Sequence, residues 1–71
     1  MKSTEQIKAI VKLGGSVIID ASKSTENIKS IVKVAQPTVE VIIKNAYKKS
    51  TENLKSIAKV ANCKVTFDLV E

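Results

Sequence analysis

The sequence comprises 71 residues with twelve lysines, no arginine, no histidine and one cysteine, and it carries a formal net charge of +5 at pH 7. A chain of this length forms one domain and buries only about 60% of the surface that its unfolded form exposes. A single cysteine excludes an intramolecular disulfide framework, the lack of histidine argues against zinc, and no apolar run approaches the roughly 18 residues of a membrane span. Since no apolar segment follows Met1-Lys2-Ser3 either, we expect a cytoplasmic protein without a signal peptide.

The first predicted unit is a helix followed by a strand. Ser3 is the expected N-cap, and Gln6 lies three residues later, so that each side chain satisfies a free backbone N–H of the other residue. Apolar residues at helical spacing predict the helix itself: Ile7, Ile10, Val11 and Leu13. Gly14-Gly15 end this helix because glycine tolerates positive φ, and residues 16–20 form a β-branched segment that predicts a strand.

The second unit repeats this order. Its helix starts after Ser24 and runs to about Ala35, because Pro37 cannot continue a helix. Residues 39–44 form the predicted strand, and residues 45–49 connect it to the next unit.

The third unit begins at Ser50, and its segment Ser-Thr-Glu-Asn-Leu-Lys-Ser-Ile-Ala-Lys-Val is a close copy of the one that begins at Ser24. The helix ends near residue 61 and the strand covers residues 64 to about 70. Aligning these two units places Phe67 on the position of Val41. The stripe expected to pack on the sheet consists of Leu54, Ile57, Ala58 and Ala61.

These units predict an α/β fold of three helix-strand repeats, residues 1–23, 24–49 and 50–71, with a three-stranded parallel sheet in the order 1-2-3. One face of the predicted strands is uniformly apolar and the other is mixed. Helices on one face of the sheet explain this asymmetry, because a sheet covered on both faces needs two apolar faces.

The repeat length and the strand-plus-helix unit resemble those of leucine-rich repeats over all three units, and the Ser-Thr-Glu-x-Ile/Leu-Lys helix starts are similar to those of small bacterial repeat proteins. This resemblance implies a very short solenoid. The asparagine or cysteine ladder of leucine-rich repeats is absent, since Asn45 and Cys63 occupy unlike positions, so no binding site is carried over.

The strand positions that point away from the predicted helices form a candidate contact surface. They are Ile18, Asp20, Glu40, Ile42, Lys44, Thr66, Asp68 and Val70. Because parallel sheets are usually buried on both faces and terminal strands leave unpaired edges, we expect a homo-oligomer, most simply a dimer, formed through the open face or an edge. Asp20 or Asp68 would then meet Lys44 of the second copy. The alternative is a half-solvated sheet with exposed charges.

The outer helix faces carry lysines four residues apart in every unit. The positions are Lys8, Lys12, Lys29, Lys33, Lys55 and Lys59. As a functional feature they would form a stripe that binds nucleic-acid phosphates regardless of base sequence, and they would release the ligand at raised salt. The simpler interpretation, which we favour, is a solvated helix face. Its positive charge is partly offset by glutamates three residues before the first lysine of each pair.

No pattern in the sequence predicts an enzyme. Asp20, Glu40 and Asp68 lie on different strands without an accompanying phosphate loop, and Gly14-Gly15 follow a helix rather than precede one. Cys63 beside a lysine is either a thiol of lowered pKa or an inert small hydrophobe. With no histidine as general base, we expect no catalytic site, no cofactor and no metal.

Overall fold

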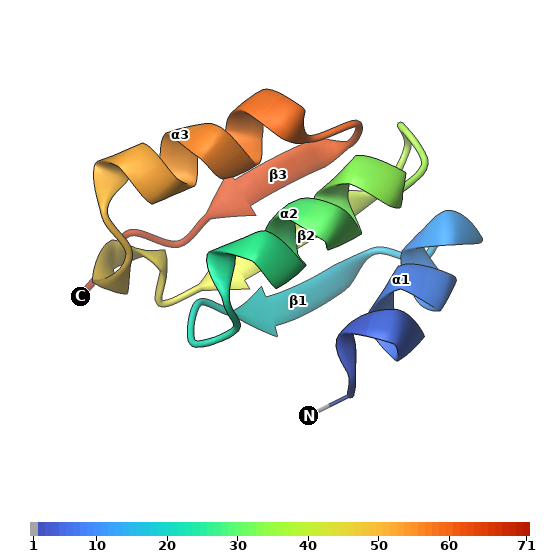
Figure 1. Ribbon diagram of the computed structural model, residues 1–71, viewed down its shortest axis with the longest axis horizontal. Coiled ribbons are helices and arrows are strands. Elements are labelled where there is room, and N and C mark those ends of the chain that lie inside the picture. The colour runs from blue at the N-terminus through green and yellow to red at the C-terminus, as the bar shows by residue number, and fades with distance from the viewer. Residues whose placement is uncertain (1) are drawn as a thin grey trace.

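A computed structural model describes residues 2–71 of the protein as three helices that alternate with three strands. The elements are α1 (Thr4–Lys12), β1 (Val17–Asp20), α2 (Thr25–Val34), β2 (Glu40–Lys44), the 3-10 turn η1 (Ala46–Lys48), α3 (Thr51–Val60) and β3 (Lys64–Phe67). The strands form a parallel sheet in the order β1-β2-β3, and all three helices lie on one face of it (Figure 1). The predicted α/β class, strand order and single helical layer are confirmed.

All three helices begin in the same way. Ser3, Ser24 and Ser50 have extended backbones, and each hydroxyl accepts a hydrogen bond from the backbone N–H three residues later. Only the first helix completes the predicted reciprocal cap, because the Gln6 side chain reaches back to the Ser3 N–H over 3.1 Å, whereas the other two helices have the shorter asparagine there. These caps satisfy backbone donors that would otherwise lack a partner in the first helical turn.

Helix α1 ends on the two glycines, as expected. The Gly14 N–H donates to the Val11 carbonyl and the Gly15 N–H to the Ile10 carbonyl, which is the bond pattern of a Schellman motif. Gly14 has φ +97°, and a Cβ on Gly15 would lie 2.6 Å from a methyl carbon of Ile10. Both positions therefore require glycine, one for its conformation and one for space.

The strand register differs from the alignment of the repeats. Val17, Val41 and Val65 pair in turn, 24 residues apart, so Phe67 lies beside Ile43 and not at the position of Val41. The reason is that the loop before β3 is two residues shorter than the loop before β2, although the two helices are near copies. The predicted equivalence of Phe67 and Val41 is wrong.

Strand β3 is shorter than predicted. It ends at Phe67, and although the Asp68 N–H still donates to the Ile43 carbonyl, the Asp68 carbonyl accepts from Ala46 in η1. The Val70 N–H then donates to the Asp68 carboxylate over 3.1 Å, which turns the chain away from the strand direction. Val70 therefore lies beyond the sheet, and its predicted place on the open face is wrong.

The connection between β2 and α3 is more ordered than an ordinary loop. Asn45 adopts the left-handed conformation with φ 60°, which asparagine tolerates better than most residues. The chain then forms η1, where Ala46 is fully buried.

The core lies between the sheet and the helical layer and is richest around the central repeat. Its buried members are Ile7, Val11, Ile19, Ala21, Ile28, Ile31, Val32, Ala35, Val39, Val41, Ile43, Ala46 and Ile57. Helix α2 and strand β2 have neighbours on both sides, whereas among residues 2–71 each outer repeat has a neighbouring repeat on one side.

The predicted stripe of α3 is only partly correct. Ile57 is buried and Leu54 and Ala61 are half-buried, but Ala58 is exposed. Ala58 lies on the flank that would meet a fourth repeat, and within residues 2–71 there is none.

Equivalent isoleucines of α1 and α2 provide a test of this layout. Ile31→Ala should cost about 2–5 kcal/mol of unfolding free energy, because Ile31 is fully buried. A domain of this size has only about 3–5 kcal/mol, so little native circular dichroism should remain. Ile10→Ala, at the equivalent position with 38% exposure, is the matched control and should stay folded. Equal losses in the two variants, measured by urea denaturation, would contradict the layout.

Candidate functional site

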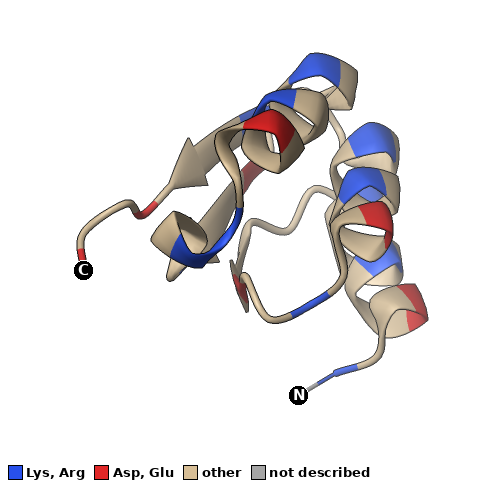
Figure 2. Ribbon diagram, turned by 60° about the vertical axis from the view of Figure 1, so that its left-hand side comes forward, with Lys and Arg blue, Asp and Glu red and all other residues tan. Residues whose placement is uncertain are grey.

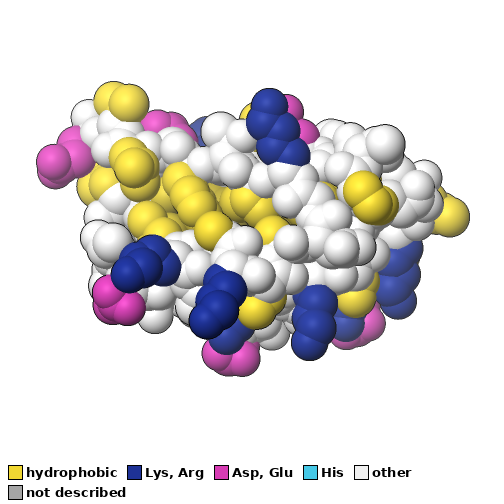
Figure 3. Space-filling model, turned by 90° about the horizontal axis from the view of Figure 1, so that it is seen from above, with side chains coloured by type: hydrophobic (Ala, Val, Ile, Leu, Met, Phe, Trp, Pro, Cys, Tyr) yellow, Lys and Arg dark blue, Asp and Glu magenta, His cyan; other side chains and the backbone are white. Residues whose placement is uncertain are grey.

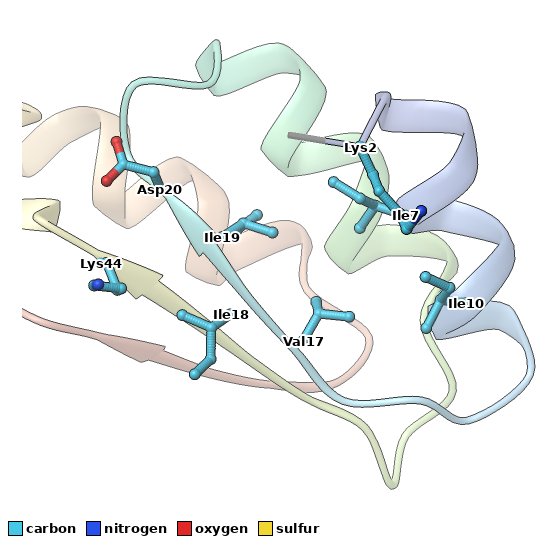
Figure 4. A pocket seen from close by; sticks show the side chains of 8 residues that line it. All are labelled: Lys2, Ile7, Ile10, Val17, Ile18, Ile19, Asp20 and Lys44. Atoms are coloured by element: carbon cyan, nitrogen blue, oxygen red, sulfur yellow. The ribbon is translucent and has the colours of Figure 1, made fainter.

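The open face of the sheet is built from alternate residues of the three strands. Ile18, Ile42 and Thr66 pair across it in one row, with Ile18 63% exposed on the outer strand. Figure 4 shows Ile18 pointing to the opposite side of β1 from Val17. The sheet therefore presents a narrow strip of apolar surface on the face that carries no helix.

The register adds Lys64 to this face, a residue that is not in the predicted contact set. Glu40 pairs with Lys64, because the strand offset is 24 residues and not the 26 of the helix starts. The Thr66 hydroxyl also donates to Glu40 over 2.6 Å, and the Ser16 hydroxyl accepts the Glu40 N–H over 3.0 Å. The polar groups around Glu40 are thus bonded within the chain.

Asp20 is held by hydrogen bonds from its own chain. The Ser22 N–H lies 2.8 Å from one carboxylate oxygen and the Asn45 side-chain amide 2.7 Å from the other. These donors, the Ser22 backbone first, lower the pKa of Asp20 from its ordinary 3.8 to about 2. Asp20 is directly beside Lys44 in the register of its own chain. Its oxygens are therefore already occupied, which weakens its predicted role as a contact to Lys44 of a second copy.

The carboxylates of the open face do not form a cluster. Glu40 and Asp20 lie at opposite ends of their strands, and Asp68 follows the end of β3. Within residues 2–71 no three His, Cys, Asp or Glu side chains are arranged to hold a metal ion.

Cys63 sits in the loop before β3. Burial raises the pKa of its thiol, and the sulfur donates weakly to the Val32 carbonyl at 3.7 Å. Of the two predicted states for Cys63, the inert hydrophobe is the one the structure supports, since a raised pKa disfavours the reactive thiolate.

The six helix lysines lie on the outer faces of the helical layer, where Figure 2 shows basic and acidic positions on all three helices. The first lysine of each pair contacts the glutamate three residues before it, with N–O distances of 3.5 Å for Lys8, 3.6 Å for Lys29 and 3.6 Å for Lys55. Because the glutamates of all three pairs are exposed to solvent, these pairs contribute little stability. The second lysines lie in the last helical turns, where a cation is favourable beside the helix C-terminus.

The two outer repeats each have an apolar hollow between helix and strand. The hollow at the α1–β1 end has a volume of about 410 Å³ and is lined by Lys2, Ile7, Ile10, Val17, Ile18, Ile19, Asp20 and Lys44 (Figure 4). The hollow at the α3–β3 end has a volume of about 360 Å³ and is lined by Tyr47, Lys49, Thr51, Leu54, Lys55, Ala58, Phe67 and Leu69. Figure 3, seen from the α3–β3 side, shows the hydrophobic side chains gathered in a band across this end. The sequence pattern indicates the unpaired strand edges but not these hollows, because the hollows depend on which flanks of the outer helices are exposed.

Comparison of the chain with models of known families, with curated proteins and with solved structures found no match. A search of residues 2–71 for a helix long and apolar enough to cross a membrane also found none.

The hydrogen bond from Asn45 to Asp20 gives a direct prediction. Asn45→Gly keeps the left-handed backbone but removes the amide, so the pKa of Asp20 should rise from about 2 toward 3.8. Because the folded pKa lies below the unfolded value, the stabilisation by this carboxylate is present above about pH 4 and is lost as the pH falls toward 2. Carbon-detected NMR titration measures the change, with the other carboxylates as internal reference. An unchanged pKa would show that the amide does not bind Asp20.

Proposed function

We propose that this protein is a small interaction module that associates with copies of itself through its sheet, at the open face or at an edge, and that it acts as a scaffold in the bacterial cytoplasm. The single observation that supports the proposal is a parallel sheet with helices on one face only (Figure 1) and with the apolar side chain of Ile18 exposed on the outer strand β1. The proposal involves no catalytic step and no cofactor.

The uncovered sheet supports self-association because such sheets are rare. Parallel sheets almost always have both faces covered, and exposed edge strands are normally short, charged or capped. Here β1 carries Ile18 at 63% exposure beside a free edge. The chain is also small, so covering this surface adds stability that its own core cannot provide.

Within this proposal the ends of the stack are better supported than the open face. The open face has one apolar row, and its charged groups Asp20 and Glu40 already have partners within the chain. The ends have apolar hollows that involve both a helix and a strand.

Light scattering during size-exclusion chromatography tests the proposal over a range of protein concentrations. We expect a mass above that of the 7.7 kDa monomer at high concentration. Ile42→Asp places a charge in the middle of the open face, so it should dissociate a face-to-face dimer and leave an edge contact nearly intact. A monomer at every concentration up to the millimolar range would rule out self-association.

The second candidate is weak nucleic-acid binding by the helix lysines. It is favoured by the repeated placement of Lys12, Lys33 and Lys59, which are exposed and form no ion pair within residues 2–71. The paired glutamates oppose it, because they bring negative charge to the same surface.

A gel-shift assay tests whether the protein binds nucleic acid. Replacing Lys29, Lys33, Lys55 and Lys59 by glutamine should abolish any shift of a random duplex, and raised salt should do the same for the unmodified protein. Absorbance at 260 nm that co-elutes with the purified protein is the companion readout, since the chain has one tyrosine and no tryptophan. A shift that persists in the quadruple variant would exclude the lysine stripe.

A further inference from the structure

Equivalent positions of the three helices differ in exposure in a way that identifies what each end lacks. Ile10, Ile31 and Ile57 occupy the same position of their repeats. Ile31 and Ile57, which each have a preceding repeat, are fully buried, whereas Ile10 is 38% exposed. This position therefore packs against the preceding repeat, and within residues 2–71 no repeat precedes the first one.

The opposite helix flank shows the converse pattern. Val11 and Val32 are fully buried, and their carbonyls accept the N–H groups of Gln36 and Asn62 in the following repeat, over 3.3 and 3.0 Å. Ala58 occupies their position in the third repeat and is exposed. Each repeat thus has a forward flank and a backward flank, and the part of the chain that the structure describes leaves one flank of each kind uncovered.

A lysine just before the start of α2 and of α3 links that helix to the preceding helix. The Lys23 ammonium donates to the Thr4 hydroxyl over 3.2 Å, and the Lys49 ammonium donates to the Thr25 hydroxyl over 3.0 Å. Both lysines belong to a Lys-Ser-Thr segment at a helix start, and this segment occurs three times in the sequence.

The third pair that this pattern requires is split between the two ends of the chain. Lys2 is the lysine of the first segment and lines the hollow at the α1–β1 end, as Figure 4 shows. Thr51 is the threonine of the last segment and lines the hollow at the α3–β3 end. A second copy placed after the first would bring its own Lys2 to Thr51 of the first copy, in the geometry of the two internal pairs.

We propose that copies of this chain stack head to tail, with the α1–β1 end of each copy on the α3–β3 end of the copy before it. Lys2 of one copy then binds Thr51 of the copy before it, and the two sheets become one. This inference rests on the self-association proposed above and names its partner and surface. It continues, between copies, the contacts that already join the repeats within each copy.

The free strand edges fit this arrangement. The Ala21 N–H donates to β2, so along alternating β1 the Ile18 amide faces the free edge. On β3 the Lys64 and Asp68 amides face β2, so the Val65 amide and carbonyl face outward. The 24-residue register that relates β1 to β2 and β2 to β3 would then pair Val65 with Val17 of the second copy, and the Ile18 N–H of that copy would donate to the Val65 carbonyl.

Two features of the internal contacts would not be reproduced. The Gly15 N–H, equivalent to that of Gln36, already donates to the Ile10 carbonyl of its own helix. The register also sets Asp68 beside Asp20 of the second copy, a like-charge pair that weakens the contact. Both features limit affinity, so we expect reversible association that depends on concentration.

A head-to-tail contact uses two different surfaces and leaves one of each free after every addition. Such contacts produce open chains unless the rotation between copies closes a ring. The average mass should therefore rise steadily with concentration instead of stopping at a dimer.

Variants that block one end each provide the decisive test. Ile18→Pro removes the edge amide of β1 without removing a bond to β2, and Ala58→Glu places a charge on the exposed forward flank of α3. Each variant alone should remain monomeric by light scattering, and an equimolar mixture should form a one-to-one dimer through the two intact ends. Ile18→Thr and Ala58→Ser are the matched controls, since they keep the amide and the small side chain and should associate like the unmodified protein.

The possible outcomes separate the two proposals. If the unmodified protein associates and both blocked variants still associate alone, the head-to-tail contact is wrong and self-association stands. If the unmodified protein stays monomeric, both proposals fail. Circular dichroism of each variant checks that it is folded, and a blocked variant that is unfolded is replaced by Leu54→Glu at the same end as Ala58 or Ile10→Glu at the same end as Ile18.

The lysine contact is tested by affinity. Lys2→Ala and Thr51→Val should each weaken association about five- to tenfold, and the double variant should be no weaker than either one, because both remove the same bond. Asp68→Asn keeps the acceptor for Val70 and removes one charge of the like-charge pair, so it should tighten association about two- to fivefold. Independent effects of Lys2 and Thr51, or an unchanged affinity for Asp68→Asn, would contradict the proposed register.

Discussion

Burial of the repeat flanks is the constraint on which the rest of this structure depends. A single helix packed on a single strand covers one face of each but leaves their two sides open, and only a neighbouring repeat covers a side. Val11, Val32, Ile31 and Ile57 are fully buried for this reason, and they account for much of the core. The helix caps, the loops and the short strands of this chain all allow the side of one repeat to pack against the side of the next.

The polar contacts between repeats follow the same geometry as the apolar ones. Lysines at successive helix starts reach the threonine of the preceding helix, and backbone N–H groups beyond the helix ends reach carbonyls of the preceding helix. These bonds recur because the helices share one sequence pattern and lie at similar spacing on a regular sheet. Within residues 2–71, the equivalent lysine Lys2 lies at one end of the fold and the equivalent threonine Thr51 lies at the other.

How much of this was predictable from sequence depends on whether a feature is local. The helix starts at Ser3, Ser24 and Ser50, the strand order and the single helical layer follow from capping residues and from which strand face is apolar. The strand register cannot be predicted in this way, because the loops differ in length and the strands pair at a spacing that differs from that of the helix starts. For this reason the predicted position of Phe67 is wrong.

Exposure at the two ends of the fold was harder to predict from the sequence. Ala58 has the same helical periodicity as Val32, so periodicity alone predicts that both are buried. Ala58 is exposed because no fourth repeat covers it within residues 2–71. The end of β3 at Phe67 likewise depends on a long-range bond from Ala46 to the Asp68 carbonyl. The candidate contact set included Val70 for this reason, since the sequence alone extends the strand to about residue 70.

Amide hydrogen exchange followed by NMR at low and high protein concentration tests the central claim that the end repeats lack a neighbour which a second copy supplies. In dilute protein the free-edge amides of Ile18 and Val65 should exchange rapidly, and the amides of Val41 and Ile43 in the central strand should exchange slowly. At a concentration where light scattering shows association, the Ile18 and Val65 amides should both become protected. Association that leaves both of them unprotected would contradict the account.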